Sequence, residues 1–398
     1  MSDEIIKITT EETNAVVQED RFQRFSLMGW WDQKKIRDAK ILVVGAGALG
    51  NEIVKNLSLL GVGHVLIADL DLIENSNLSR SVLYRASDNG LPKSEVAARS
   101  AVDIFPEMHV ASFHGNVVYD LGLGVYDWAD IVIGGLDNRE ARLSINRNCW
   151  RLNKPWIDGA IEQISGVARV FVPDGPCYEC TMSEMDWKLL NRRRSCNLLT
   201  REEMQGGKTP TTPTISSVIA GVQCQEAVKY LHGMETIAGK GFIFNGVSAD
   251  SYLVEYQRKD DCYSHETADK IIRLDQKASE MTVGSLLDIA RRSLGAETTL
   301  ELARDILESL SCRSCGFEEQ LFTSLCKVST SMSACPHCGK RRDVNTIFTI
   351  NGDETFLDRT FAEIGVPAFD IVWARSSSAL VGYEFAGDAA DVLSNALN

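Results

Sequence analysis

The chain has 398 residues, of which 44% are hydrophobic and 24% are charged, as expected of a globular protein large enough for two or three domains. Its net charge of −14 argues against a nucleic-acid-binding protein, and no apolar run approaches the roughly 20 residues that a membrane span requires. The eleven cysteines, without a signal-peptide pattern, predict metal ligands or catalytic thiols in a reducing, cytoplasmic compartment.

The first residues are polar, and we expect residues 1–20 to form a lead-in that is helical or partly disordered. The sequence RFQRF, at residues 21–25, then opens an amphipathic segment that extends to Ile36. Its apolar side is expected to pack on the following domain or on a partner.

The next stretch has the pattern of a strand, a glycine turn, a helix and a second strand. Apolar runs at residues 41–44 and 65–68 predict two buried parallel strands. Between them, the turn GAGALG occupies residues 45–50 and precedes leucines and isoleucines at helical spacing. This unit predicts a nucleotide-binding domain.

Individual residues of this unit have distinct expected roles. Gly45 permits a tight turn, and Gly47, after Ala46, lets the backbone approach a phosphate at the N-terminus of the helix. Asp69 ends the second strand, where its carboxylate can reach ribose hydroxyls. Which nucleotide binds depends on the charges that follow.

A set of polar and charged residues follows the glycine turn along the chain. A nicotinamide site needs a flat apolar slot, whereas a triphosphate site uses Arg and Lys to neutralise phosphate oxygens. An aspartate at the carboxyl end of a strand can hold Mg²⁺. The set therefore favours ATP with Mg²⁺; its members are Asp71, Asn77, Arg80, Lys93, Asp137 and Asn138.

Strands and helices continue to alternate after this unit. Helices are predicted to begin at Pro92-Lys93 and at Thr212-Pro213, the latter ending at Gly233. The alternation predicts an α/β fold with a doubly wound, Rossmann-like mixed sheet over residues 21–266. Further strands are predicted at residues 109–113, 130–134, 155–159, 167–172, 242–246 and 252–257.

A long irregular segment at about residues 174–212 interrupts the domain and contains Cys177-x-x-Cys180. A second pair, Cys262 and His265, follows the last predicted strand and completes a four-ligand set. The four residues predict a structural Zn²⁺ site that fastens the segment to the end of the domain. An incidental CxxH without metal is the alternative.

The composition changes near Thr267, and residues 267–398 are expected to form a smaller α+β module. Helical segments are predicted at about residues 282–308. Two cysteine knuckles then predict a zinc ribbon over residues 312–338, and hence a second structural Zn²⁺ site. The predicted ligands are Cys312, Cys315, Cys335 and Cys338.

Several motifs in fixed order resemble the ubiquitin-activating (E1-like) superfamily, which includes the ThiF and MoeB sulfur-carrier adenylyltransferases of thiazole and molybdopterin synthesis. They are GAGALG, ADLDLIENSNLSR, PKSE and IGGLDNREAR, and the resemblance covers roughly residues 20–260. It implies a homodimer in which Asp69 binds ribose, Val118 lies by the adenine and Asp137 binds Mg²⁺. Phosphates would contact Asn77, Arg80 and Lys93, and Arg24 would be an arginine finger entering the other protomer's site. Ala48, where many relatives have Gly, and His265, where they have Cys, depart from the pattern.

The resemblance also implies a reaction. ATP would adenylate the C-terminal glycine of a ubiquitin-like protein, and a loop cysteine would then form a thioester for transfer to an E2-like carrier. Cys196 has the matching placement, directly after a run of three arginines and a serine, and nearby cations favour a thiolate. The alternative is a sulfur-carrier adenylyltransferase without an obligatory thioester. Action on tRNA and nucleotide binding without turnover are disfavoured by the acidic balance and by the intact charge set.

Overall fold

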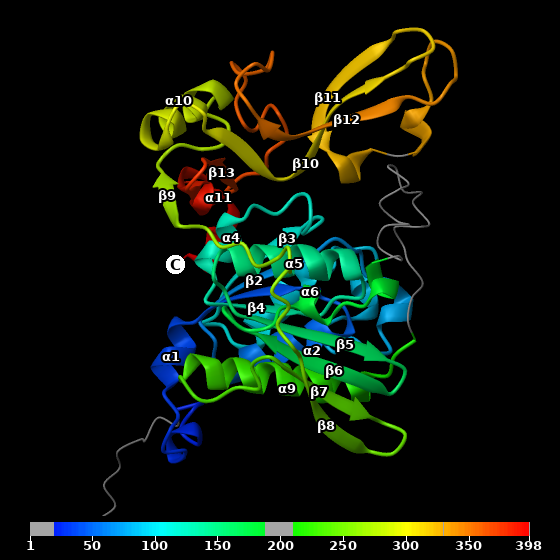
Figure 1. Cartoon of the computed structure of the whole chain (residues 1–398). Coiled ribbons are helices and arrows are strands. Elements are labelled where there is room, and N and C mark those ends of the chain that lie inside the picture. Colours follow the sequence, from blue (N-terminus) through cyan, green and yellow to red (C-terminus); the bar gives the residue numbers. More distant parts are fainter. Residues whose placement is uncertain (1–19, 188–209, 329, 398) are drawn as a thin grey trace, which may run out of the picture.

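The computed structural model describes residues 20–187, 210–328 and 330–397 (Figure 1). No helix in these ranges is long and apolar enough to cross a membrane. The expected lead-in over residues 1–20 lies, except for Asp20, outside the described residues. Two sheets organise the rest of the chain.

The first sheet has eight strands in the order β3-β2-β1-β4-β5-β6-β7-β8. The first five in this order are parallel, and each later strand pairs antiparallel to its neighbour. The predicted Rossmann-like mixed sheet is therefore confirmed. Its strands are β1 (Lys40–Val44), β2 (His64–Asp69), β3 (His109–His114), β4 (Ile131–Gly134), β5 (Trp156–Glu162), β6 (Ser165–Phe171), β7 (Lys240–Asn245) and β8 (Asp250–Glu255).

Helices cover both faces of this sheet. Alternate residues of the parallel strands point to opposite faces, so apolar residues in both sets need a cover on each side. Ile41 and Val43 of β1 belong to one hydrophobic cluster, and Leu42 and Val44 belong to another. In Figure 1, α2 and α9 lie below strands β2 and β4, α4 and α5 lie above them, and β7 and β8 extend below α9. The helices are α1 (Gln33–Asp38), α2 (Ala48–Leu60), α3 (Lys93–Ile104), α4 (Gly124–Trp128), α5 (Arg139–Arg151), α6 (Tyr178–Thr181) and α9 (Pro213–Leu231).

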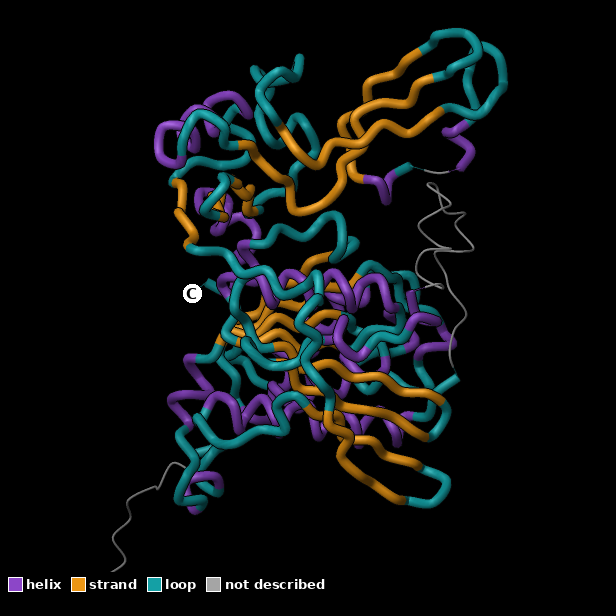
Figure 2. The backbone as a smooth tube through the Cα atoms, in the orientation of Figure 1, coloured by secondary structure: helices purple, strands orange, loops and turns teal. Residues whose placement is uncertain are grey.

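The second sheet, in residues 267–398, has six strands in the order β11-β10-β13-β14-β9, with β12 paired to β10. We call these residues the C-terminal module; the domain boundary at residue 266 stays a prediction. Figure 2 shows the outer part of β10 with β11 and β12 as an arm that extends from the module. The elements are β9 (Lys270–Leu274), α10 (Val283–Leu294), β10 (Thr299–Ser311), β11 (Glu318–Ser324), β12 (Asp343–Ile350), β13 (Ile371–Arg375), β14 (Leu380–Phe385) and α11 (Ala389–Leu393).

Short 3-10 helices also occur in both parts, and they lie mainly in loops between the longer elements. They are η1 (Phe25–Leu27), η2 (Asn75–Asn77), η3 (Ala86–Asp88), η4 (Leu325–Lys327), η5 (Thr330–Ser333), η6 (Ala386–Asp388) and η7 (Ser394–Ala396).

The helical prediction for residues 282–308 is only half right. Helix α10 ends at Leu294, and Gly295 follows it with φ 110°, a conformation that a helix cannot continue. Residues 299–308 belong instead to β10, where Leu300 and Leu302 alternate with less buried neighbours. Strand pairing with β12 and β13 fixes that segment, and local sequence does not reveal those partners.

The two sheets share a hydrophobic cluster. Leu42 and Val44 of β1 are in the same cluster as Phe369 and Trp373 of the C-terminal module. The chain then returns to the first sheet, where the backbone oxygen of Ala396 lies 2.9 Å from His64 Nδ1. The C-terminal module is therefore packed on the face of the first sheet that carries α4 and α5.

Candidate functional site

The glycine turn between β1 and α2 is formed by residues that need to be glycine for different reasons. Gly45 has φ 93°, and a Cβ there would lie 2.6 Å from the backbone oxygen of Gly135. A Cβ on Gly50 would overlap the backbone oxygen of Gly45. Gly47 is the N-cap of α2, no side chain caps the helix, and a Cβ at Gly47 would meet no described atom within 4 Å. The space beside Gly47 is therefore free of described protein atoms at a helix N-terminus, as an anion site requires.

Three predicted residues gather next to this turn. Asp69 accepts hydrogen bonds from the backbone N–H groups of Ala46 (2.6 Å) and Asp71 (2.7 Å). The buried Lys93 donates from Nζ to Asp71 Oδ2 at 2.6 Å. Burial raises the pKa of Asp69, and Lys93 opposes that rise. The structure thus brings Asp69, Asp71 and Lys93 together at the ends of β1 and β2.

Two buried residues that the sequence analysis missed hold the turn in place. Asn51 donates to the backbone oxygen of Ala46 at 2.8 Å and accepts from the backbone N–H of Leu83 at 2.9 Å. Tyr84 Oη also donates to the oxygen of Ala46, at 2.5 Å. Burial raises the pKa of Tyr84, so its hydroxyl stays a donor. Asn51 shares its helix face with Val54, Lys55 and Ser58, so no local pattern distinguished it for this role.

Asn77 and Arg80 lie on the loop between β2 and α3. An isolated β-bridge between Leu72 and Pro92 closes this loop beside Lys93. The buried Asn77 accepts from the backbone N–H of Glu74 at 2.9 Å, and Arg80 Nη1 donates to the oxygen of Ser76 at 2.9 Å. These contacts are local to the loop, so the predicted phosphate roles of Asn77 and Arg80 stay predictions.

Asp137 lies between β4 and α5, on a loop that packs against the glycine turn. The Cβ position of Gly135 in this loop is 3.0 Å from the backbone nitrogen of Gly50. Asp137 is exposed. Its neighbour Asn138 caps α5 by accepting from the backbone N–H of Ala141 at 2.7 Å. Asp137 is therefore available to a ligand beside the turn, whereas the Asn138 side chain already has a structural role.

A buried ion pair supports the loop that carries Asp137. Arg142 Nε lies 3.0 Å from Asp158 Oδ1, and the same guanidinium donates to the backbone oxygen of Leu136. Arg169 Nη2 lies 2.6 Å from the other oxygen of Asp158. Because burying an unpaired charge is costly, this network fixes the loop tightly. Arg142 is the last residue of the motif IGGLDNREAR, but nothing in the sequence marked Asp158 or Arg169 as its partners.

Val118 lies half-buried on the loop that follows β3. Gly115 starts this loop and donates from its backbone N–H to the oxygen of Asp69 at 3.2 Å. Val118 N–H donates to Asn116 Oδ1 at 2.9 Å. The loop therefore begins next to Asp69, the residue predicted to bind ribose. This position agrees with the adenine contact predicted for Val118, which stays a prediction.

The remaining predicted catalytic residues are Arg24 and Cys196. Arg24 is exposed in the N-terminal segment, and the cation–π contact there is made by Arg21, 5.3 Å from the Phe105 ring centroid. Cys196 lies outside the described residues. Neither the arginine-finger role nor the nucleophile role is tested by this structure.

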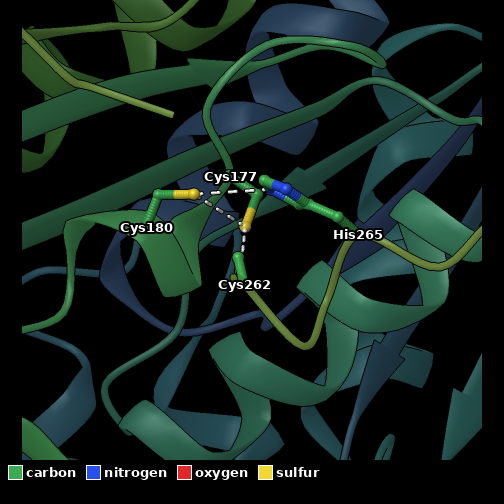
Figure 3. A group of neighbouring side chains, drawn as sticks. All are labelled: Cys177, Cys180, Cys262 and His265. Atoms are coloured by element: carbon green, nitrogen blue, oxygen red, sulfur yellow. Dashed lines mark hydrogen bonds between the residues drawn. The ribbon is translucent and has the colours of Figure 1, made fainter. Parts of the chain in front are cut away.

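Cys177, Cys180, Cys262 and His265 converge from two segments (Figure 3). Their ligand atoms all lie within 4.8 Å of one another. The Sγ atoms of Cys177 and Cys262 are 3.5 Å apart, and Cys180 Sγ is 3.4 Å from His265 Nε2. Ligands at Zn–S and Zn–N bond lengths on a tetrahedron are about 3.6–3.8 Å apart, so these residues fit Zn²⁺. The structure thus brings the four predicted residues together, and their role as Zn²⁺ ligands stays a prediction.

A hydrogen-bond network joins the two segments around this cluster. Ser264 donates to the buried carboxylate of Glu179, and Asn146 of α5 donates to Ser264 Oγ at 2.9 Å. Asn146 also accepts from the backbone N–H of Tyr178 at 2.7 Å. The Trp150 ring stacks on His265 with centroids 4.1 Å apart. Both knuckles are thus held on α5, and His265 is kept in a fixed orientation.

The second cysteine cluster lies at the tip of the arm formed by β10, β11 and β12. The Sγ atoms of Cys312 and Cys338 are 3.5 Å apart, as are those of Cys315 and Cys335. In each knuckle a glycine with positive φ, Gly316 or Gly339, donates back to the first cysteine's oxygen. The two matched knuckles are consistent with the predicted zinc ribbon.

A model of the ThiF family matches residues 19–264 of this chain. The SAMP-activating enzyme E1 of Haloferax volcanii is 30% identical over 255 residues, which are 62% of this chain and 88% of that protein. The sulfur carrier protein ThiS adenylyltransferase of Escherichia coli (strain K12) is 28% identical over 232 residues, covering 58% of this chain and 87% of that protein.

A crystal structure of Escherichia coli MccB with ATP has the same fold, with a TM-score of 0.51 and 23% sequence identity. The alignment covers 62% of this chain and 74% of that chain.

Proposed function

This chain belongs to the ThiF family, and on that premise we propose that it uses ATP to adenylate the C-terminal carboxylate of a ubiquitin-like or sulfur-carrier protein. The observation that carries the proposal is the space beside Gly47, free of described protein atoms and bordered by Asp69 and by the Lys93–Asp71 pair. The names of the archaeal and bacterial relatives support it, because each describes the activation of a small protein.

In this reaction, the carboxylate of the small protein attacks the α-phosphorus of ATP and pyrophosphate leaves. Both reactants are anions, so the protein must mainly position them and neutralise charge. Lys93 and Arg80 would contact phosphate oxygens, and Asp69 would accept from the ribose hydroxyls. Asp137 would hold a Mg²⁺ ion, which supplies further positive charge when bound. No general base is required, because the carboxylate is already the nucleophile.

We further propose that the chain is an E1 enzyme, and the E1 name of the archaeal relative favours this over the sulfur-carrier alternative. Cys196 would attack the acyl-adenylate to form a thioester and release AMP, and an E2-like protein would accept the acyl group. The enzyme would act as a cytoplasmic homodimer in which Arg24 reaches the partner's site. Each cysteine cluster would hold one structural Zn²⁺.

Pyrophosphate exchange tests the adenylation step. Labelled pyrophosphate should enter ATP only when a small protein ending in glycine is present. Lys93→Met should lower the exchange rate at least tenfold, because a buried amino group next to the phosphates is lost. Lys270→Met, at an exposed lysine of β9, is the matched control. Exchange at the wild-type rate in Lys93→Met would contradict the proposed site.

A thiol-sensitive adduct separates the E1 function from the sulfur-carrier alternative. Incubation with ATP and the small protein should give a reductant-sensitive conjugate that Cys196→Ala abolishes. Cys224→Ala is the control, because Cys224 is a buried thiol outside both cysteine clusters. An adduct that persists in Cys196→Ala rules out Cys196 as the nucleophile. Exchange activity without any adduct supports the sulfur-carrier alternative.

A further inference from the structure

The loop at residues 115–123 lies between the candidate nucleotide site and the C-terminal module. On the nucleotide side, its first residue is hydrogen-bonded to the backbone oxygen of Asp69 at 3.2 Å. Tyr119 Oη lies 3.2 Å from Glu140 Oε1, in the first turn of α5 after Asp137. The loop also carries Val118, so its position sets one wall of the site in which we place the nucleotide.

On its other side, the loop is held by one buried arginine of the C-terminal module. Arg304 Nη1 donates to the backbone oxygens of Tyr119 (3.1 Å) and Leu121 (2.8 Å). Its Nη2 lies 2.9 Å from Asp370 Oδ1, which also accepts from the backbone N–H of Leu123 at 2.8 Å. The Arg304 and Asp370 side chains are 8% and 4% exposed. A planar guanidinium with several donors suits this task, because it satisfies two carbonyls and a carboxylate together.

The backbones of the two parts also touch directly beside this ion pair. Gly124 N–H donates to the oxygen of Phe369 at 2.8 Å. A Cβ on Gly122 would overlap the backbone oxygen of Ala368. The two backbone segments are therefore too close for any residue other than glycine at this position. Cys326 Sγ lies 3.3 Å from Asp120 Oδ2, which accepts from the Asn116 N–H at 3.2 Å. The loop thus has little freedom to move independently of the C-terminal module.

We propose that Arg304 and Asp370 are positioning residues for the nucleotide site, so that ATP binding and the placement of the C-terminal module depend on each other through residues 115–123. This inference rests on the proposed function, because it takes the nucleotide to lie between Asp69 and Val118. Neither residue touches the nucleotide; both act by fixing the loop that does. The family match ends at residue 264, so this contact comes from the part of the chain beyond it.

Affinity for ATP with Mg²⁺, measured by calorimetry on the full chain, tests the inference. Arg304→Met leaves two loop carbonyls and Asp370 without their shared donor, and we expect the Kd for ATP to rise about tenfold. Arg304→Lys should give an intermediate Kd, because it restores the charge opposite Asp370 but offers a single nitrogen. Arg292→Met, at an exposed arginine of α10, should leave the Kd unchanged. A purely structural role would lower the number of binding sites and leave the affinity of each unchanged.

The outcomes separate this inference from the proposed function. If the wild-type chain binds no ATP, the proposed function fails and the coupling fails with it. If the wild-type chain binds ATP and folded Arg304→Met binds it equally well, only the coupling is overturned.

Hydrogen exchange on the wild-type chain keeps the inference testable if the variants do not fold. Because coupling is reciprocal, ATP should slow amide exchange at residues 299–311 and 368–372 as well as at residues 115–123. Slower amide exchange at residues 45–50 and 115–123, with no change in the C-terminal module, would overturn the proposed coupling.

Discussion

The glycines of the turn after β1 differ in what a methyl group would meet. At Gly50 the methyl would collide with backbone, and at Gly45 the backbone also has φ 93°. At Gly47 the backbone is extended, with φ −72° and ψ −153°, outside the left-handed region that favours glycine, and the space beside it is open. One turn therefore contains glycines required for folding and one whose small size matters to a ligand alone.

Alanine substitutions separate these two requirements. Gly47→Ala should retain the wild-type melting temperature and weaken ATP binding tenfold or more, because the methyl occupies space next to the phosphates. Gly50→Ala should lower the melting temperature by several degrees, because overpacking against fixed backbone typically costs about 1–3 kcal/mol. Thermal unfolding and calorimetric ATP titration measure both effects. Equal ATP affinity in Gly47→Ala and wild type would place the phosphates elsewhere.

Glu384 makes the contact between the two parts of the chain sensitive to pH. Burial, together with the nearby Asp127, raises its pKa to about 7, and Arg273 opposes the rise from 3.4 Å away. In the unfolded chain a glutamate titrates near about 4.3. Between these values the folded state holds a proton that the unfolded state has lost, so stability falls as pH rises from about 4 to 7.

Glu384→Gln should remove this slope. Relative to wild type, the variant should gain about 2 kcal/mol of stability between pH 5 and pH 8, because it never places that charge in a buried site. Melting temperatures across this pH range give the measurement, with the exposed Glu255→Gln as control. If the melting temperatures of Glu384→Gln and wild type change in parallel with pH, another group is responsible for the pH dependence.

At the scale of elements, each cysteine cluster joins two separate segments of the chain. The ribbon closes the ends of β10, β11 and β12, and beside it lies a small hydrophobic cluster centred on Leu307, Leu310 and Val328. A core of this size contributes little, so the metal must supply much of the local stability.

Metal analysis of the purified chain should give two Zn²⁺ per chain. Cys315→Ser should reduce this to one and raise proteolytic cleavage within residues 312–342, without changing ATP affinity. Cys177→Ser should also leave one Zn²⁺, with the new cleavage near residues 177–182 and 258–265. Unchanged zinc content in Cys315→Ser would contradict the assignment of that cluster.

The sequence predicted elements well where a local pattern determines them. Predicted strands at residues 109–113 and 167–172 correspond to β3 and β6 within two residues, and Thr212 caps α9 as expected. Fixed spacing also identified both cysteine clusters. The failures depended on distant partners: β10 needs β12 and β13, and Arg142 acquires its role through Asp158. Asn51 and Tyr84 meet at Ala46 only after folding, so no pattern marked them as a pair.

At the scale of the molecule, the two parts share one interior. Phe369, Ile371 and Trp373 pack in the same cluster as Leu42 and Leu66 of the first sheet. Separating the parts would expose this surface to water, and exposed apolar patches of this kind cause aggregation.

A chain truncated after residue 266 should therefore aggregate or melt well below the full-length protein. Size-exclusion chromatography and thermal unfolding provide the measurements, with the full chain as reference. A monodisperse 1–266 fragment that binds ATP as tightly as the full chain would show that the shared cluster is dispensable, and would also contradict coupling through Arg304.

The contact between Ala396 and His64 has a consequence for biosynthesis. Leu393 and Ala396 lie against β2 and β3, strands that are translated roughly three hundred residues earlier. Until residue 396 leaves the ribosome, the nascent first sheet has an incomplete cover, although domains usually fold as they emerge. The apolar surface that Leu393 and Ala396 cover is therefore exposed through most of synthesis, and chaperones that bind the nascent chain would protect it from premature association.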